Sequence, residues 1–161
     1  NRIVKPGTDF DESSFLDRVK ESFALEKMGK EPYKPKTKGE IGMYYRDEWY
    51  RLTIDDKCYM GDPVEDLDVA VLQKQLLEPV FGIVDPKVDE RIDFVGGIRG
   101  LAELERRVHT DALAAFAMFP TDIHELFAVS DAGKLMPPKS TWFEPKLRSG
   151  LLIHKIEEAE L

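Results

Sequence analysis

The residues best suited to chemistry lie in one basic segment near the end of the chain. Residues 133–150, GKLMPPKSTWFEPKLRSG, carry four cationic side chains and a single carboxylate, whereas the 161-residue chain has a net charge of −8. Two hydroxyl side chains, those of Ser140 and Thr141, directly follow Lys139, and three prolines restrict the backbone. Cationic side chains with hydroxyls beside them bind phosphate or carboxylate groups. We therefore predict an anion-binding site formed by Lys139, Ser140, Thr141, Lys146 and Arg148.

The alternative for this segment is structural. Its cations would pair with the protein's own acids, and Trp142 and Phe143 would fix the loop to the core. The segment also imitates the phosphate-binding loop G-x-x-x-x-G-K-[ST], but Pro138 stands where that motif has a glycine. Proline has no N–H to offer a phosphate, and the segment follows a predicted helix rather than a strand. A P-loop fold is therefore excluded.

Two glycines, Gly96 and Gly97, form an incomplete dinucleotide-binding motif, because Val95 replaces its first glycine. We interpret them as a tight turn from a strand into a helix, with anion binding at the helix start as the alternative. A zinc motif beginning at His124 is incomplete as well, since Ala128 stands where the second histidine belongs. We predict no metal site and assign no catalytic residue.

Six acidic residues between positions 55 and 68 form a further cluster. A pair of carboxylates there could bind Mg²⁺. The favoured interpretation is a solvated connector that ends in a helix cap at Asp68.

The bulk composition restricts the class of protein. With 42% hydrophobic and 34% charged residues, the chain has the composition of one soluble globular domain over residues 1–161. Its negative charge disfavours nucleic acid and anionic membranes as partners. The single Cys58 fits a reducing cytosol, so we predict a cytoplasmic protein. Because the chain starts at Asn1 without Met, we expect it to be a fragment of a longer protein.

The pattern of apolar residues predicts the elements that position these groups. Helical spacing predicts helices over residues 12–28, 69–78 and 101–108, and a fourth helix that Thr121 caps, with Ile123, Leu126 and Phe127 facing inward. Alternation predicts a hairpin over residues 41–54, and apolar runs predict strands at 92–95, 111–119 and 151–156. We predict an α+β fold with helices on one side of a mostly antiparallel sheet.

Several segments resemble the uncharacterised family called domain of unknown function 1015. They are RIDFVGG at 91–97, FAMFPT at 116–121 and MPPKSTWFEPKLRSGL at 136–151. The opening NRIV resembles the start of that family's second half, residues 47–52 its W-Y-x-L hairpin, and residues 67–72 its L-D-V-x-x-L helix start.

The resemblance implies a partner. Full-length members of the family have an N-terminal half with an Asp-Gly-His-His-Arg motif that resembles the ParB/sulfiredoxin group, which includes nucleotide-dependent kinases of free serine. The resemblance therefore implies that residues 1–161 are the C-terminal domain of a longer protein, and we expect this domain to complete an anion-binding cleft with its own N-terminal half. A small anionic ligand would bind there, with ATP or ADP and Mg²⁺ as the implied cofactors. The alternative is a non-enzymatic ParB-like regulatory or scaffold module in which this domain forms a homodimer.

Overall fold

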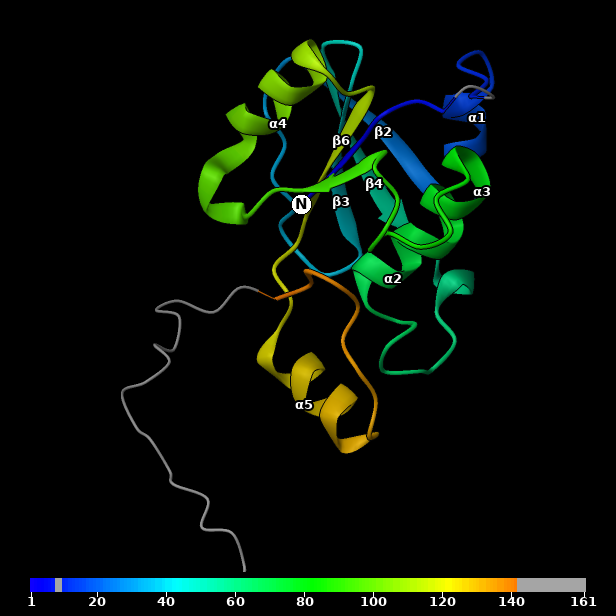
Figure 1. Cartoon of the computed structure of the whole chain (residues 1–161), viewed down its shortest axis with the longest axis vertical. Helices are drawn as coiled ribbons and strands as arrows, with labels where there is room; N and C mark the ends of the chain where they lie inside the picture. The colour runs from blue at the N-terminus through cyan, green and yellow to red at the C-terminus, as the bar shows by residue number, and fades with distance from the viewer. Residues whose placement is uncertain (8–9, 142–161) are drawn as a thin grey trace, which may run out of the picture.

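Six strands form one sheet, and every strand pairing in it is antiparallel (Figure 1). The structure is a computed structural model that describes residues 1–7 and 10–141. The strands, in the spatial order β2-β4-β3-β6-β1-β5, are β1 (Arg2–Val4), β2 (Phe23–Gly29), β3 (Glu40–Tyr45), β4 (Glu48–Ile54), β5 (Ile92–Phe94) and β6 (Ala114–Met118). The helices are α1 (Phe15–Lys20), α2 (Asp68–Leu72), α3 (Glu78–Phe81), α4 (Gly100–Thr110) and α5 (Ile123–Asp131), with 3₁₀ turns at Asp56–Cys58 and Gly97–Arg99 and a π-helix at Gln73–Leu77.

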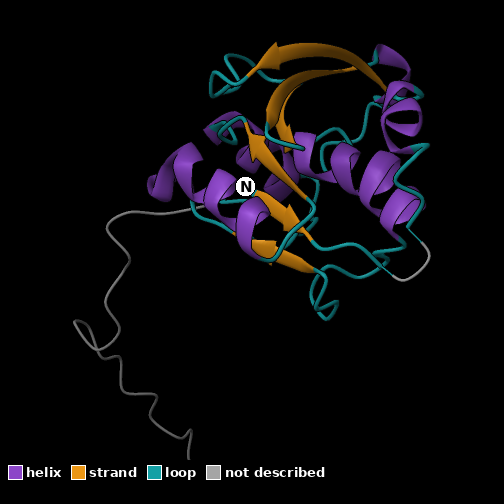
Figure 2. Ribbon diagram, turned by 90° about the horizontal axis from the view of Figure 1, so that it is seen from above, coloured by secondary structure: helices purple, strands orange, loops and turns teal. Residues whose placement is uncertain are grey.

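The predicted α+β class is confirmed, but the helices cover both faces of the sheet rather than one (Figure 2). Successive strand residues point to opposite faces, and β3 and β6 are buried on both. Met43 and Tyr45 belong to a core with residues of α1, α2 and α3, whereas Tyr44 belongs to a second core with Leu104 of α4. A sheet that is apolar on both faces needs a cover on each side.

Several predicted elements are present. The predicted hairpin is formed by β3 and β4, which Arg46 and Asp47 join with φ angles of 50° and 61°. Two successive positive φ angles are typical of a type I′ turn, whose twist suits a hairpin. The predicted strands at 92–95 and 111–119 correspond to β5 and β6, and the predicted helix at 101–108 to α4.

The predicted helix over residues 12–28 is wrong in its second half. Helix α1 ends at Lys20, and Phe23–Gly29 forms strand β2. Strand β2 pairs with β4, with Phe23 opposite Ile54. Without β2, the outer edge of β4 would expose a row of unpaired backbone groups, and sheet pairing therefore outweighs local helical spacing here.

The predicted helix over residues 69–78 also differs from the structure. Asp68 does not cap it, since both carboxylate oxygens accept a hydrogen bond from the Gly39 N–H, at 3.1 and 3.0 Å. The helical path continues past Pro79 to Phe81 through the π-helix Gln73–Leu77. A proline within a helix crowds the carbonyl of the preceding turn, and the wider π turn provides room for it.

Helix α5 begins with Asp122 rather than Thr121 as its cap. Asp122 accepts a hydrogen bond from the His124 N–H, and Glu125 accepts one from the Asp122 N–H. Ile123 and Phe127 are 49% and 55% exposed, so the prediction that they face inward is wrong. The helix lies below the sheet in Figure 1, apart from the other helices. The strand predicted at 151–156 lies outside the described residues.

Candidate functional site

A cavity of about 450 Å³ lies at one end of the sheet, where three strands meet. Because β1 is antiparallel to both β5 and β6, the start of β1 lies beside the ends of the other two. Arg2 is opposite Phe94 in β5 and Phe116 in β6. Contributions to the cavity wall come from β1, the turn after β5, the segment from β6 into α5, and residues 139–141.

Residues 137–141, which we call the strap, close one side of this cavity. Four successive carbonyls of the strap accept hydrogen bonds from side chains. Ser140 Oγ donates to the Pro137 carbonyl at 2.7 Å, and Thr121 Oγ1 donates to the Ser140 carbonyl at 3.0 Å. Between them, Arg2 donates to the carbonyls of Pro138 and Lys139, at 3.1 and 3.4 Å. Arg2 of β1 and Thr121, between β6 and α5, therefore hold the strap in place.

Arg2 is the most unusual residue of the cavity, because its charged side chain is buried at 5% exposure. It stacks on the Phe94 ring at 4.6 Å and has no carboxylate partner among the described residues. Burial lowers the pKa of Arg2 to about 10. A guanidinium has five N–H donors, and carbonyls of the described residues accept three hydrogen bonds from it. Two donors are therefore left for another acceptor.

The structure brings three of the five predicted anion-binding residues together. Lys139, Ser140 and Thr141 all line the cavity, whereas Lys146 and Arg148 lie outside the described residues. Lys139 is exposed and forms no ion pair within residues 1–7 and 10–141. The Ser140 hydroxyl donates within the strap, and so it can only accept from a ligand.

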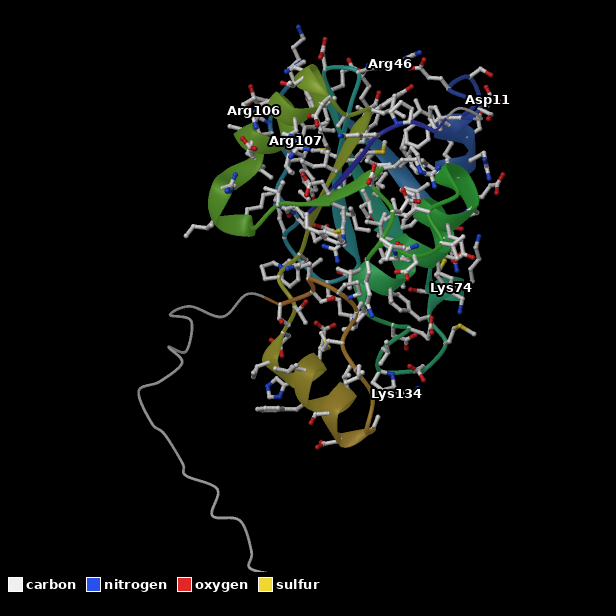
Figure 3. The ribbon with its side chains drawn as sticks, viewed as in Figure 1. Asp11, Arg46, Lys74, Arg106, Arg107 and Lys134 are labelled. Atoms are coloured by element: carbon white, nitrogen blue, oxygen red, sulfur yellow. The ribbon has the colours of Figure 1, made fainter. Side chains whose placement is uncertain are left out.

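The glycine turn and the acidic cluster have different roles. Gly96 and Gly97 line the same cavity, and their N–H groups donate to no other described residue. The carboxylate of Asp62, by contrast, accepts from the backbone N–H of Val64 at 2.9 Å and pairs with Lys134, which is labelled beside α5 in Figure 3. Lys134 and the nearby backbone N–H groups lower the pKa of Asp62 to about 2. This carboxylate therefore holds a loop of the protein itself.

Sequence reasoning missed Arg2 and Thr121, which hold the strap. The available signal for Arg2 was a charged residue directly before the apolar pair of a buried strand. Within the described ranges, no group of three or more histidine, cysteine, aspartate or glutamate side chains is arranged to hold a metal ion. None of the described helices has the length and apolar character needed to cross a bilayer.

Comparison with curated proteins and with solved structures found no match. A family model described as "Protein of unknown function (DUF1015)" does match, over residues 1–70. The match ends before the three similar segments at 91–97, 116–121 and 136–151, and it leaves open both the placement in the family's second half and the ParB-like partner. The matched residues 1–70 run from β1 into α2.

Proposed function

We propose that this domain binds a small anionic ligand, a phosphate or carboxylate compound, in the cavity between β1, β5, β6 and the strap. The observation that carries the proposal is Arg2, a buried guanidinium on the cavity wall without a carboxylate partner among the described residues. Burying a charge is costly unless it is paired or hydrogen-bonded. An anion in the cavity would supply the partner for its two remaining donors.

The remaining charges around the cavity support an anion. Lys139 is a second cation on the wall, and Asp122 is the wall's one carboxylate among the described residues. The Asp122 carboxylate is engaged in capping α5, with its Oδ1 atom 2.7 Å from the His124 N–H. The wall is therefore positive on balance, although the whole chain carries −8. Arginine is suited to this role, because its planar donors match the oxygens of phosphate and carboxylate.

Size and backbone donors agree with a small metabolite. A volume of about 450 Å³ is within the range of small-molecule sites and far below that of a polymer groove. The Gly96 and Gly97 N–H groups, at the start of the 3₁₀ turn Gly97–Arg99, add neutral donors for ligand oxygens. The finer form of this proposal is phosphoryl transfer from ATP with Mg²⁺ to a serine-like substrate, with an N-terminal half supplying the catalytic groups.

A second candidate function is an interface, which exposed apolar residues around α5 support. Ile123 and Phe127 on α5 and Leu135 after it are 49%, 55% and 88% exposed. Apolar residues grouped on a projecting helix often mark a surface that another chain covers. Analytical ultracentrifugation of the wild-type chain and Phe127→Ser tests this. A concentration-dependent dimer that the substitution dissociates supports the interface, and a monomer at all concentrations contradicts it.

Calorimetric titration tests the anion site. Phosphate, O-phosphoserine, ADP and ATP are titrated into the wild-type chain, Lys139→Met, Arg2→Lys and the control Lys34→Met. Losing one charged hydrogen bond costs about 1.5–3 kcal/mol, so we expect Lys139→Met to weaken binding about tenfold or more. Arg2→Lys keeps the charge but loses the planar donors, and we expect a larger loss.

Lys34 is an exposed lysine of the connector between β2 and β3 and is not among the cavity-lining residues, so Lys34→Met should leave the affinity unchanged. Circular dichroism confirms that each variant is folded before titration. No saturable binding of any of the four anions by the wild-type chain overturns the proposal. Binding that Lys34→Met weakens as much as Lys139→Met does would reduce it to non-specific charge attraction.

A further inference from the structure

A second cavity, of about 390 Å³, lies on the other side of the strap. Pro137 and Pro138 line this second cavity, whereas Lys139, the next residue, lines the first. Arg2 and Val69 line both cavities. The two spaces are therefore neighbours, with Arg2, Val69 and the strap between them.

The second cavity differs from the first in its charge. Its wall carries three cations and three carboxylates, so its formal charges cancel. Two of these charges neutralise each other directly, since Lys74, labelled in Figure 3, lies 3.2 Å from a carboxylate oxygen of Glu65. The remaining wall is largely apolar, formed by Val64, Val69, Ala70, Pro86, Pro137 and Pro138. Such a wall favours an uncharged apolar group and offers an anion no net attraction.

The π-helix Gln73–Leu77 forms part of this wall through Gln73 and Lys74. Gln73 Nε2 donates to the Ile83 carbonyl at 2.6 Å, which fixes the side chain and leaves its amide oxygen as an acceptor. A π turn displaces side chains from their α-helical positions, and such turns are frequent at functional sites. The second cavity therefore has, beside its balanced charges, an apolar part of the wall and one fixed amide, as small-molecule sites commonly do.

The strap is attached to the rest of the described chain through side-chain hydrogen bonds rather than through backbone pairing. Apart from contacts within the strap itself, its backbone forms no backbone–backbone hydrogen bond to the rest of the described chain. It is held by side-chain donors, of which Arg2 is one. An anion on the two remaining Arg2 donors would share this guanidinium with the strap carbonyls and so lie beside the strap.

We infer that the two cavities are the head and tail compartments of one ligand site, and that the ligand is an amphiphilic anion. Its phosphate or carboxylate head binds in the first cavity beside Arg2 and Lys139, and its aliphatic or aromatic tail lies in the second, against Val64, Ala70 and Pro86. This inference rests on the proposed function, because the head occupies the proposed anion site. It adds the class of ligand that the site selects.

A series of alkyl phosphates tests the inference. Methyl, butyl and hexyl phosphate are titrated into the wild-type chain by calorimetry. Each buried methylene contributes about 0.8 kcal/mol, so we expect affinity to rise about fourfold per methylene until the second cavity is filled. In Ala70→Phe, which fills that cavity from α2, hexyl phosphate should bind no better than methyl phosphate, and methyl phosphate should bind as it does to the wild type.

The matched control is Ala102→Phe, which adds the same side chain at an exposed position of α4 and should leave the whole series unchanged. Val64→Trp fills the same cavity from a loop and replaces Ala70→Phe if that variant does not fold. If methyl phosphate fails to bind the wild type, the proposed function falls and this inference falls with it. If methyl phosphate binds but affinity does not rise with chain length, or rises equally in Ala70→Phe, this inference alone is overturned.

Discussion

Two buried charged residues, Arg2 and Asp68, invite comparison because they are alike in most respects. They are 5% and 8% exposed, and neither forms an ion pair among the described residues. Each holds a distant loop through backbone groups. Arg2 donates to carbonyls of the strap, and Asp68 accepts from the N–H of Gly39, 29 residues before it.

The two residues differ in what surrounds them. Asp68 lines neither cavity, and both of its oxygens face the same Gly39 N–H. Burial raises the pKa of Asp68 to about 6. Arg2 lines both cavities and keeps two donors that no described residue accepts. Asp68, in packed surroundings, therefore holds the fold, whereas we propose Arg2, beside open space, as a binding group.

The largest expected effect in stability concerns Asp68 and pH. The pKa of Asp68 rises from 3.8 to about 6 on folding, so the folded state binds a proton more tightly than the unfolded state does. The stabilisation that this proton provides is fully present below the unfolded pKa and is lost as the pH rises through the folded pKa. A shift of this size corresponds to about 3 kcal/mol, from 1.36 kcal/mol per pKa unit. Asp68→Asn cannot titrate, and we expect its stability advantage over the wild type to shrink by about this amount between pH 8 and pH 4.

Urea unfolding of both chains across this pH range measures the difference, and Asp68→Ala serves as the comparison variant. Asp68→Ala should show the same pH trend relative to the wild type. It should also be less stable than Asp68→Asn at every pH, by about 1–3 kcal/mol, because the Gly39 N–H loses its acceptor. A gap between Asp68→Asn and the wild type that stays constant from pH 8 to pH 4 would show that Asp68 is not a buried clamp.

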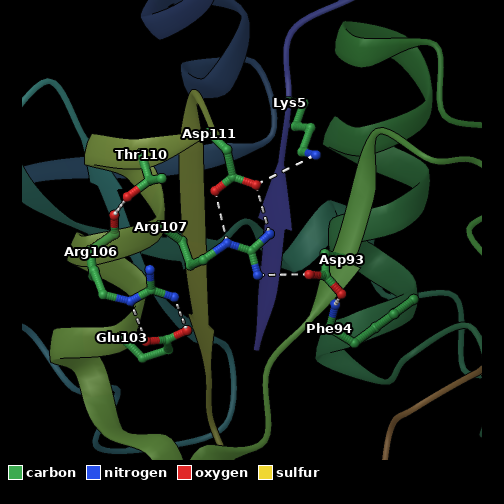
Figure 4. A network of polar contacts seen from close by, with 8 residues as sticks. All are labelled: Lys5, Asp93, Phe94, Glu103, Arg106, Arg107, Thr110 and Asp111. Atoms are coloured by element: carbon green, nitrogen blue, oxygen red, sulfur yellow. Dashed lines mark hydrogen bonds and ion pairs between the residues drawn. The ribbon is translucent and has the colours of Figure 1, made fainter.

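The next prediction compares Arg2 with Arg107, an arginine that has carboxylate partners. Arg107 in α4 lies 2.7 Å from a carboxylate oxygen of Asp93 and 2.8 Å from one of Asp111, and Asp111 also pairs with Lys5 (Figure 4). These hydrogen bonds raise the pKa of Arg107 further above its usual range. We expect Arg107→Met to lower the free energy of unfolding by about 1–2 kcal/mol, since the pairs are partly buried. Its affinity for phosphate should not change.

Arg106→Met is the matched control, because Arg106 pairs with Glu103 at 2.7 Å but its side chain is 59% exposed. Exposed pairs contribute little, so we expect a loss below about 0.5 kcal/mol. Urea unfolding and phosphate titration are applied to both variants. Should Arg107→Met weaken phosphate binding as strongly as Arg2→Lys does, the absence of a carboxylate partner would not be what distinguishes Arg2.

The fold was predictable from the sequence where the determining pattern is local. The hairpin of β3 and β4 follows from the alternation of Ile41, Met43 and Tyr45, and the strand β6 from a short apolar run closed by Pro120. Strand β2 was not predictable in the same way, because its apolar residues also fit a helical spacing and only the free edge of β4 decides between the two. For helix α5 the predicted burial of Ile123 and Phe127 is wrong, because nothing in the local sequence shows that this helix projects from the sheet.

The candidate site, like the fold, was predictable only where the determining residues are close together in the sequence. Lys139, Ser140 and Thr141 were predictable because cations and hydroxyls stand together in an acidic chain, and they line the cavity. Arg2 was not, since the strap carbonyls that it holds are 136 and 137 residues away in the sequence. No periodicity or spacing connects positions so far apart. The register of β1 between β5 and β6 makes that connection, and it is a property of the folded sheet.

The smallest expected effect concerns the strap itself. Lys139 has a φ of 55°, in the left-handed region that costs a non-glycine residue about 1–2 kcal/mol. Glycine adopts this conformation without that cost but loses more chain entropy on folding, so we expect Lys139→Gly to raise stability by about 0.5 kcal/mol. The same substitution should weaken phosphate binding as Lys139→Met does. A variant that is more stable but binds phosphate more weakly would group Lys139 with Arg2, as a residue that serves ligand binding and destabilises the fold. The control is Lys36→Gly, at an exposed position without a positive φ, which should lower stability slightly. If Lys139→Gly also lowered stability, Lys139 would belong with Asp68 among the residues that hold the fold.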